Sequence, residues 1–191
     1  MTRSTRSICL TTVAALMAWT NGFHCDSWAA DSRAEKERSI KAAVVLKIAK
    51  FVSWPDHTPS ANQFTVCLYQ NPILNEESHQ FNREKLWPNS VITKEINTWP
   101  EADNCNLLLV EANKLLAFKL DVKHGPHKPV LVIADLTQGP SKGKAHTGVH
   151  VALVRQGTRI AFEVHLSELG KSGLKISSEF LKLARIVRGD E

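Results

Sequence analysis

Residues 158–187, TRIAFEVHLSELGKSGLKISSEFLKLARIV, decide how the domain ends. In the first half of this stretch apolar and polar side chains alternate, which is typical of a half-buried strand. Its inward-facing set is Ile160, Phe162 and Val164. After Gly170 and Gly173, Ser177 or Ser178 can cap a helix whose apolar residues recur at helical spacing up to Val187. We therefore expect a strand, a glycine-containing connection and a closing helix.

The chain before this stretch alternates between strand and helix patterns. Strands are predicted at residues 64–68, 91–96, 105–110 and 129–136, and helices at about 72–83 and 113–120. The runs at 105–110 and 129–136 are continuously apolar, as in strands covered on both faces. Residues 149–154 and 159–164 face each other across Gln156-Gly157 as a hairpin. The pattern predicts one three-layer α/β domain, with a mixed, mostly parallel sheet flanked by helices, a C-terminal β-hairpin and the closing helix.

Residues 1–29 have the features of a secretory signal peptide. Arg3 and Arg6 precede an apolar run at 8–19, and the segment 27–29, Ser-Trp-Ala, has small residues at both recognition positions of a cleavage site. An uncleaved membrane anchor is the alternative, and the short apolar run disfavours it. We expect residues 30–191 to form one exported domain that does not itself span the membrane.

The charge of the chain argues against nucleic-acid binding, and its cysteines indicate a disulfide. The chain has 24 Lys and Arg against 19 Asp and Glu without a dense basic block, which is weak evidence for nucleic-acid binding, and export weakens it further. Cys67 and Cys105 are the two cysteines that remain after cleavage. In an oxidising compartment a disulfide is the simplest expectation, and two unpaired buried thiols are the alternative.

The first helix of the exported domain is predicted from a capping box at Ser32–Glu35 to the stop at Trp54-Pro55. Apolar residues extend almost around this helix, interrupted by lysines. Such a helix is either buried inside its own domain or shared with another chain. The predicted contact residues for a partner or a second copy are Leu46, Lys47, Phe51 and Trp54.

No pattern of catalytic or metal-ligating residues is recognisable. His124 and His127 lie in a Gly-Pro turn without further ligands nearby, so no metal is assigned. The chain has no Gly-x-Ser-x-Gly elbow, no helical His-Glu-x-x-His and no phosphate loop. We therefore expect neither an enzyme nor a bound cofactor.

One strand face is a candidate ligand site. Opposite the inward-facing set, Arg159, Glu163 and His165 project together and can hold a small anionic or zwitterionic ligand. An ordinary solvated strand face is the alternative.

Three groups of segments, taken together, are similar to the YfiR family of exported regulators. They are residues 41–55, residues 64–67 with 105–110, and residues 160–164 with 173–184. The resemblance implies a periplasmic α/β protein, commonly dimeric, that binds and restrains the periplasmic sensor region of an inner-membrane diguanylate cyclase. Release of that restraint raises cyclic di-GMP. The family's cysteine pair falls on Cys67 and Cys105, whereas a second pair found in some relatives has no counterpart at 138–148.

Two other classes of function remain in view. A periplasmic ligand-binding or accessory module for a transporter or a histidine kinase is the main alternative. A hydrolase is the third, and the missing nucleophile motif disfavours it.

Overall fold

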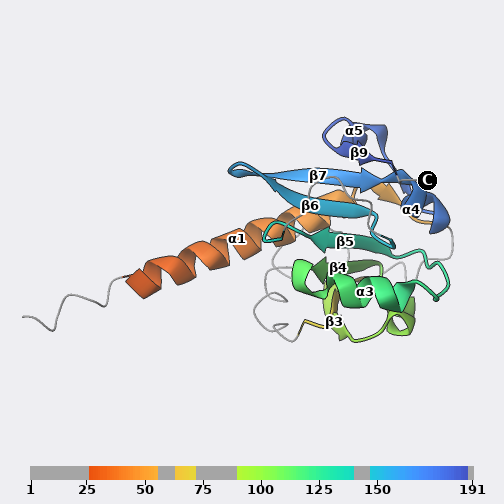
Figure 1. The fold of residues 1–191 in the computed structure, drawn as a ribbon, viewed down its shortest axis with the longest axis horizontal. Helices are drawn as coiled ribbons and strands as arrows, with labels where there is room; N and C mark the ends of the chain where they lie inside the picture. The colour runs from red at the N-terminus through yellow and green to blue at the C-terminus, as the bar shows by residue number, and fades with distance from the viewer. Residues whose placement is uncertain (1–25, 56–62, 72–89, 140–146, 189–191) are drawn as a thin grey trace, which may run out of the picture. The chain divides into compact units, whose positions relative to one another are not determined.

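The computed structural model describes residues 26–55, 63–71, 90–139 and 147–188 (Figure 1). The chain divides into two units, Met1–Glu37 and Arg38–Glu191, and helix α1 (Asp26–Ala49) contributes to both. In the second unit the described strands form a seven-stranded sheet in the order β3-β2-β4-β5-β6-β7-β9. These strands are β2 (Gln63–Tyr69), β3 (Ser90–Ile96), β4 (Leu107–Glu111), β5 (Leu131–Asp135), β6 (Val151–Gln156), β7 (Arg159–His165) and β9 (Arg185–Val187).

The strand directions confirm the predicted mixed, mostly parallel sheet. Neighbouring strands from β3 to β6 are parallel, β6 and β7 form the antiparallel hairpin, and β9 adds parallel to β7. The hairpin turns at Gly157, whose φ of 60° favours glycine. The remaining elements are β1 (Val52–Ser53) paired with β8 (Lys175–Ile176), and the helices η1 (Trp99–Asn104), η2 (Ala112–Lys114), α3 (Leu115–Val122), α4 (Leu166–Lys171) and α5 (Ser178–Leu181).

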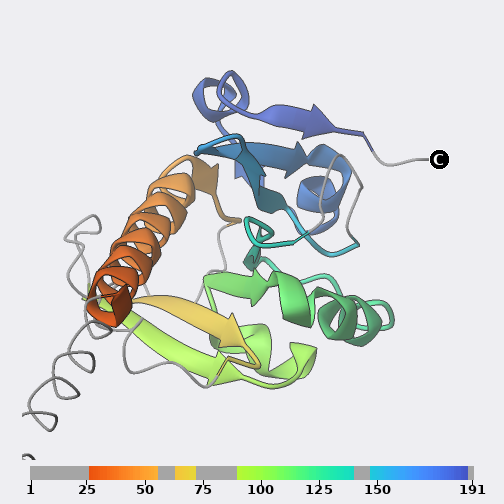
Figure 2. The same ribbon diagram turned by 60° about the vertical axis from the view of Figure 1, so that its left-hand side comes forward.

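The interior strands supply two hydrophobic cores, one on each face of the sheet. Figure 2 shows α1 and α3 on opposite sides of the sheet. In β4, Leu107 belongs to the core on the α1 side, and Leu108 and Val110 belong to the core on the α3 side. Because successive side chains of a strand point to opposite faces, a strand covered on both sides needs a continuous apolar run. The prediction for residues 105–110 and 129–136 is confirmed.

The first helix differs from the prediction at both ends. It begins at Asp26, before the predicted cap at Ser32, and it ends at Ala49 instead of at Trp54. The end is earlier because Val52 and Ser53 pair with β8, and the carbonyl of Phe51 accepts a hydrogen bond from Ser177 N at 2.8 Å. Those partners come from a distant part of the chain, which a local pattern does not contain.

The closing helix is present but shorter than predicted. Ser177 caps it, since the Ser177 side chain accepts a hydrogen bond from Phe180 N at 3.3 Å, and the helix α5 ends at Leu181. The expected helical continuation to Val187 is wrong, because residues 185–187 form β9 along the edge of β7. The short helix α4, which the sequence analysis did not predict, follows β7 directly.

Several predictions lie outside the described residues. They are the helix at 72–83 and the signal peptide, except that residues 26–29 form the start of α1. The cleavage site and the domain boundary at residue 29 stay predictions. Within the described ranges, no helix is both long and apolar enough to cross a membrane.

Candidate functional site

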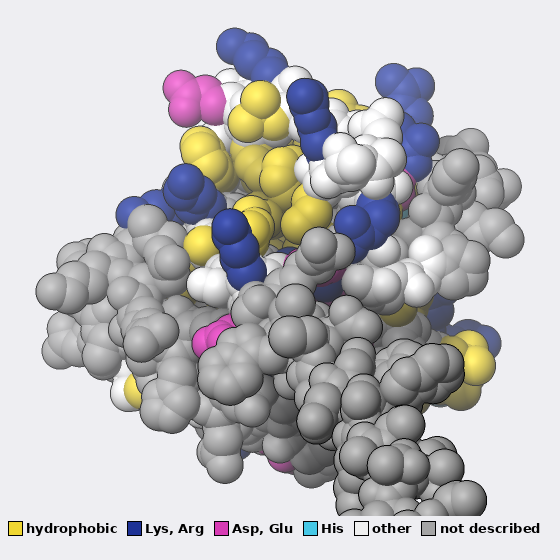
Figure 3. All heavy atoms as spheres, turned by 90° about the vertical axis from the view of Figure 1, so that its left-hand side faces the viewer, with side chains coloured by type: hydrophobic (Ala, Val, Ile, Leu, Met, Phe, Trp, Pro, Cys, Tyr) yellow, Lys and Arg dark blue, Asp and Glu magenta, His cyan; other side chains and the backbone are white. Residues whose placement is uncertain are grey.

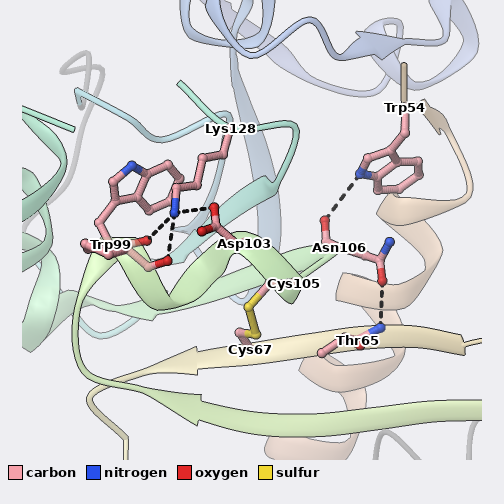
Figure 4. The surroundings of a disulfide bond; sticks show 9 residues. Trp54, Thr65, Cys67, Trp99, Asp103, Cys105, Asn106 and Lys128 are labelled. Atoms are coloured by element: carbon pink, nitrogen blue, oxygen red, sulfur yellow. Dashed lines mark hydrogen bonds and ion pairs between the residues drawn. A yellow bond between two sulfur atoms is a disulfide. The ribbon is translucent and has the colours of Figure 1, made fainter. Parts of the chain in front are cut away.

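A disulfide joins Cys67 and Cys105, with their Cα atoms 5.8 Å apart (Figure 4). Of the two alternatives left open by the sequence, the disulfide is therefore confirmed. Cys67 lies within β2 and Cys105 lies just before β4, and both side chains are buried in the core on the α3 side. The bond ties together two strands that are neighbours in the sheet and 38 residues apart in the chain.

A buried lysine holds η1 beside the disulfide. Lys128 Nζ donates to the carbonyls of Trp99 and Pro100 at 3.0 and 2.9 Å, and lies 2.6 Å from Asp103 Oδ1. It also lies 5.4 Å from the centre of the Trp99 ring (Figure 4). An ammonium group has three donors, and three acceptors surround this one. Lys128 is therefore a structural residue.

His150, on the same side of the sheet, is fully enclosed and forms two directed hydrogen bonds. Val132 N donates to His150 Nδ1 at 2.9 Å, which places the ring proton on Nε2, 2.9 Å from Ser172 Oγ. Burial lowers the pKa of His150 to about 4. With a proton already on Nε2, the imidazole cannot take the proton of the Ser172 hydroxyl. The pair therefore does not act as the base and nucleophile of a hydrolase.

The strand face predicted to hold a ligand is less open than expected. Arg159 is exposed, but Glu163 and His165 are only 2% and 1% exposed. Glu163 is buried because β9 lies beside β7, where Arg185 pairs with the Glu163 carboxylate. The alternative of a solvated strand face therefore does not hold at these two residues. Ligand binding by this set stays a prediction.

The four predicted contact residues near the end of α1 have different surroundings. Leu46 is 0% exposed and belongs to the core, so the burial alternative holds for it. Lys47 is exposed, while Phe51 and Trp54 are half-buried. The Trp54 indole donates to the carbonyl of Asn106 at 3.3 Å (Figure 4). Partner contact by Lys47, Phe51 and Trp54 stays a prediction, whereas Leu46 is occupied by the chain's own core.

The two cores differ in how much apolar surface they leave uncovered. On the α1 side, the partly buried hydrophobic residues are Val44, Phe51, Trp54, Leu109, Ile160, Phe162, Ile176, Leu181 and Ala184. On the α3 side they are Ala112, Leu115, Ala117 and Ala161, mostly small side chains. The partly buried apolar side chains are therefore larger and more numerous on the α1 side, whereas on the α3 side Leu116 and Leu120 of α3 are largely exposed, at 71% and 64%.

We use the term open apolar face for Phe51, Ile160, Phe162, Leu181 and Ile186. The first four pack against the α1-side core, and the rings of Phe51 and Phe162 lie 5.7 and 5.4 Å from the ring of the buried Phe180. Ile186 of β9 is paired in register with Val164, so it points to the same side of the sheet. It is 45% exposed. Phe51, which follows α1, and residues of β7, α5 and β9 thus contribute to the same side of the sheet.

Cations border this face. Lys47, Lys50, Arg159 and Lys182 are exposed and are close in sequence to members of the open apolar face. Figure 3 shows hydrophobic side chains gathered in the upper part of this side, with Lys and Arg side chains around them. An apolar centre with a charged rim is the arrangement of a protein-binding surface.

The sequence pattern predicts inward-facing positions for Ile160 and Phe162, and a contact with a partner or a second copy for Phe51. For β9, the sequence feature that indicates a strand is the β-branched pair Ile186-Val187.

The family of the protein follows from a comparison with known families. Residues 38–185 match the YfiR/HmsC-like family, and this range begins at the first residue of the second unit. The chain belongs to the YfiR/HmsC-like family. This is a family of periplasmic regulators of cyclic di-GMP signalling, with no enzymatic activity of its own. No curated protein matches the chain.

Proposed function

We propose that this protein is exported to the periplasm and restrains an inner-membrane diguanylate cyclase by binding its periplasmic region. The observation that carries the proposal is the open apolar face, in a member of a family of cyclic di-GMP regulators. The cations at its border favour a partner surface that is apolar at the centre and acidic at the rim.

The proposal includes the removal of residues 1–29 and a homodimeric state. Binding of the cyclase region holds the enzyme in a less active form, and release of the protein raises cyclic di-GMP. This contact is formed by the open apolar face, which includes Phe51, together with Lys47 and Trp54 near the end of α1.

The test is complementation of a strain that lacks the protein, with cellular cyclic di-GMP as the readout. Loss of the protein should raise cyclic di-GMP, and the wild-type chain should lower it again. Ile186→Glu places a charge on the open apolar face and should fail to lower it. The matched control is Ile92→Glu, because Ile92 is 37% exposed on β3, at the opposite edge of the sheet.

The outcomes separate the candidate functions. Equal repression by both variants would exclude the open apolar face as the contact surface. A level of cyclic di-GMP that does not change on loss of the protein would instead favour an accessory role for a transporter or a histidine kinase. Both variants must accumulate to the wild-type amount in the periplasm, as judged by immunoblotting.

A further inference from the structure

A cavity of about 430 Å³ lies at the carboxyl ends of β4 and β5. Glu111 and Asp135, the last residues of these two strands, are paired in register and both line it. Lys41 of α1, Asn113 and Gln138 also contribute to the lining. Sites for small organic molecules have volumes of about 300 to 1,000 Å³. The cavity is therefore large enough for a compact metabolite.

The connections of the sheet place this cavity beside a topological switch point. The chain leaves β2 to form β3 on one side, and leaves β4 to form β5 on the other side. Ligands of open α/β sheets bind outside the carboxyl ends of strands where the connections diverge in this way. Asn71 follows β2 and donates to Glu111 Oε1 at 3.1 Å, so both strands at the switch point contribute to this arrangement.

The carboxylate of Asp135 is neutralised inside the protein. Lys41 Nζ lies 2.9 Å from Asp135 Oδ2, and each side chain is 16% exposed. The other oxygen of Asp135 accepts hydrogen bonds from Thr137 N and Thr137 Oγ1, at 3.0 and 2.6 Å. Asp135 and Lys41 therefore cancel each other's charge and leave little capacity for a ligand.

Glu111 retains its negative charge at the cavity wall. The amide of Asn71 is its hydrogen-bond partner within the described ranges, and no described cation forms an ion pair with it. Beside it, Asn113 offers an amide oxygen as an acceptor, and Ala112 offers apolar surface. One carboxylate without a paired cation, an amide acceptor and an apolar patch together favour a cation with a hydrocarbon body.

We propose that this cavity binds a small organic ammonium ion. The ammonium group forms an ion pair with Glu111 and a hydrogen bond to the amide oxygen of Asn113, and the carbon chain packs on Ala112. This site is separate from the open apolar face, and the proposal does not depend on the regulatory function.

The first experiment is a titration of the isotopically labelled full domain with n-butylamine and with putrescine, followed by NMR of the backbone amides. Both amines should give saturable shifts at residues 111–113 and 138–139. The neutral analogue 1-butanol, which has no ammonium group, should give none. The proposal fails if neither amine produces saturable shifts, if the shifts map elsewhere, or if 1-butanol produces the same shifts.

The second experiment uses variants of the lining. Glu111→Gln keeps an acceptor for Asn71 but removes the charge, and should weaken amine binding by at least about tenfold. The control is Glu101→Gln, because Glu101 is an exposed acid of η1 that does not line the cavity. Circular dichroism must show that each variant is folded.

Asn113→Asp provides a variant with the opposite expected effect. Asn113 is exposed, so this substitution preserves the fold while it adds a second carboxylate to the lining. It should tighten amine binding, most of all for the dication putrescine. Unchanged affinity in Asn113→Asp, or in a folded Glu111→Gln, would overturn the proposal.

Discussion

The two faces of the sheet use their residues in different ways. On the α3 side, the disulfide, Lys128 and His150 all have their partners inside the protein. On the α1 side, large hydrophobic side chains such as Phe162 and Ile186 remain partly uncovered. Satisfied polar groups rigidify a fold, and uncovered apolar surface supports binding. Changes on the α3 side should therefore alter stability, and changes on the open apolar face should alter association.

The largest effect is expected from the disulfide. Replacing both cysteines, Cys67→Ala with Cys105→Ala, should lower the free energy of unfolding by about 4 kcal/mol, because the bond restricts a loop of 38 residues in the unfolded chain. Urea unfolding monitored by circular dichroism measures the change. Dithiothreitol should destabilise the wild-type domain similarly and leave the double variant unaffected. A double variant as stable as the wild type would contradict the role assigned to the α3 side.

The next largest effect is a loss of stability in acid. The folded-state pKa of His150 is lowered to about 4 from an ordinary value of 6.5, so the unfolded chain binds the proton more readily. Stability should fall by about 3 kcal/mol as the pH decreases from 6.5 to 4. The pKa of His165 is also lowered from its ordinary value, and burial is the main cause.

Two variants test this dependence on pH. His150→Asn keeps a side-chain acceptor for Val132 N and should flatten the decrease between pH 6.5 and 4. His124→Asn changes an exposed histidine and should leave the decrease as it is in the wild type. Urea unfolding at several pH values gives both curves. Parallel curves for His150→Asn and the wild type would contradict the assignment.

An intermediate effect is expected from the ion pair between Lys41 and Asp135. Lys41→Met leaves the Asp135 carboxylate without its cation in a mostly buried position, and should lower the free energy of unfolding by about 2 kcal/mol. Lys47→Met, on the exposed side of the same helix, is the control and should change it by less than about 0.5 kcal/mol. Equal effects of the two substitutions in thermal unfolding would show that the ion pair of Lys41 with Asp135 does not stabilise the fold.

The smallest effect on stability is expected where the effect on association is largest. Ile186→Glu and Leu116→Glu both change exposed side chains, and each should alter the free energy of unfolding by about 0.5 kcal/mol or less. Leu116 belongs to α3, so only Ile186→Glu should weaken the complex with the periplasmic region of the proposed cyclase partner. Size-exclusion chromatography with light scattering measures this. Dissociation by Leu116→Glu alone would reverse the proposed roles of the two faces.

Much of the sheet is predictable because its signal is local. Leu107, Leu108 and Val110 form a continuous run since alternate residues enter the two cores, and β4 and β5 are recognised from that run alone. The hairpin is equally local, because its turn contains Gly157. The disulfide required one fact beyond the sequence, the distance between two Cα atoms.

The candidate site is less predictable because it depends on distant pairings. Residues 180–187 have helical spacing, yet β7 recruits 185–187 as a strand, and that recruitment also buries Glu163. The open apolar face combines Phe51 and Ile186, which lie near opposite ends of the domain's sequence. A pattern within one segment cannot place Phe51 on one surface with residues from β7, α5 and β9.

The position of β9 in the chain has a consequence for the order of assembly. During synthesis or export the chain emerges from its N-terminus, so β2 and β4 can pair, and their cysteines can be oxidised, well before residues 185–187 are available. Until β9 arrives, β7 is a bare sheet edge on which Glu163 lacks its arginine. For a time, therefore, β2 is already cross-linked to the start of β4 while the edge of β7 is still free to pair with another chain. A chaperone that binds incompletely folded chains would act at that edge.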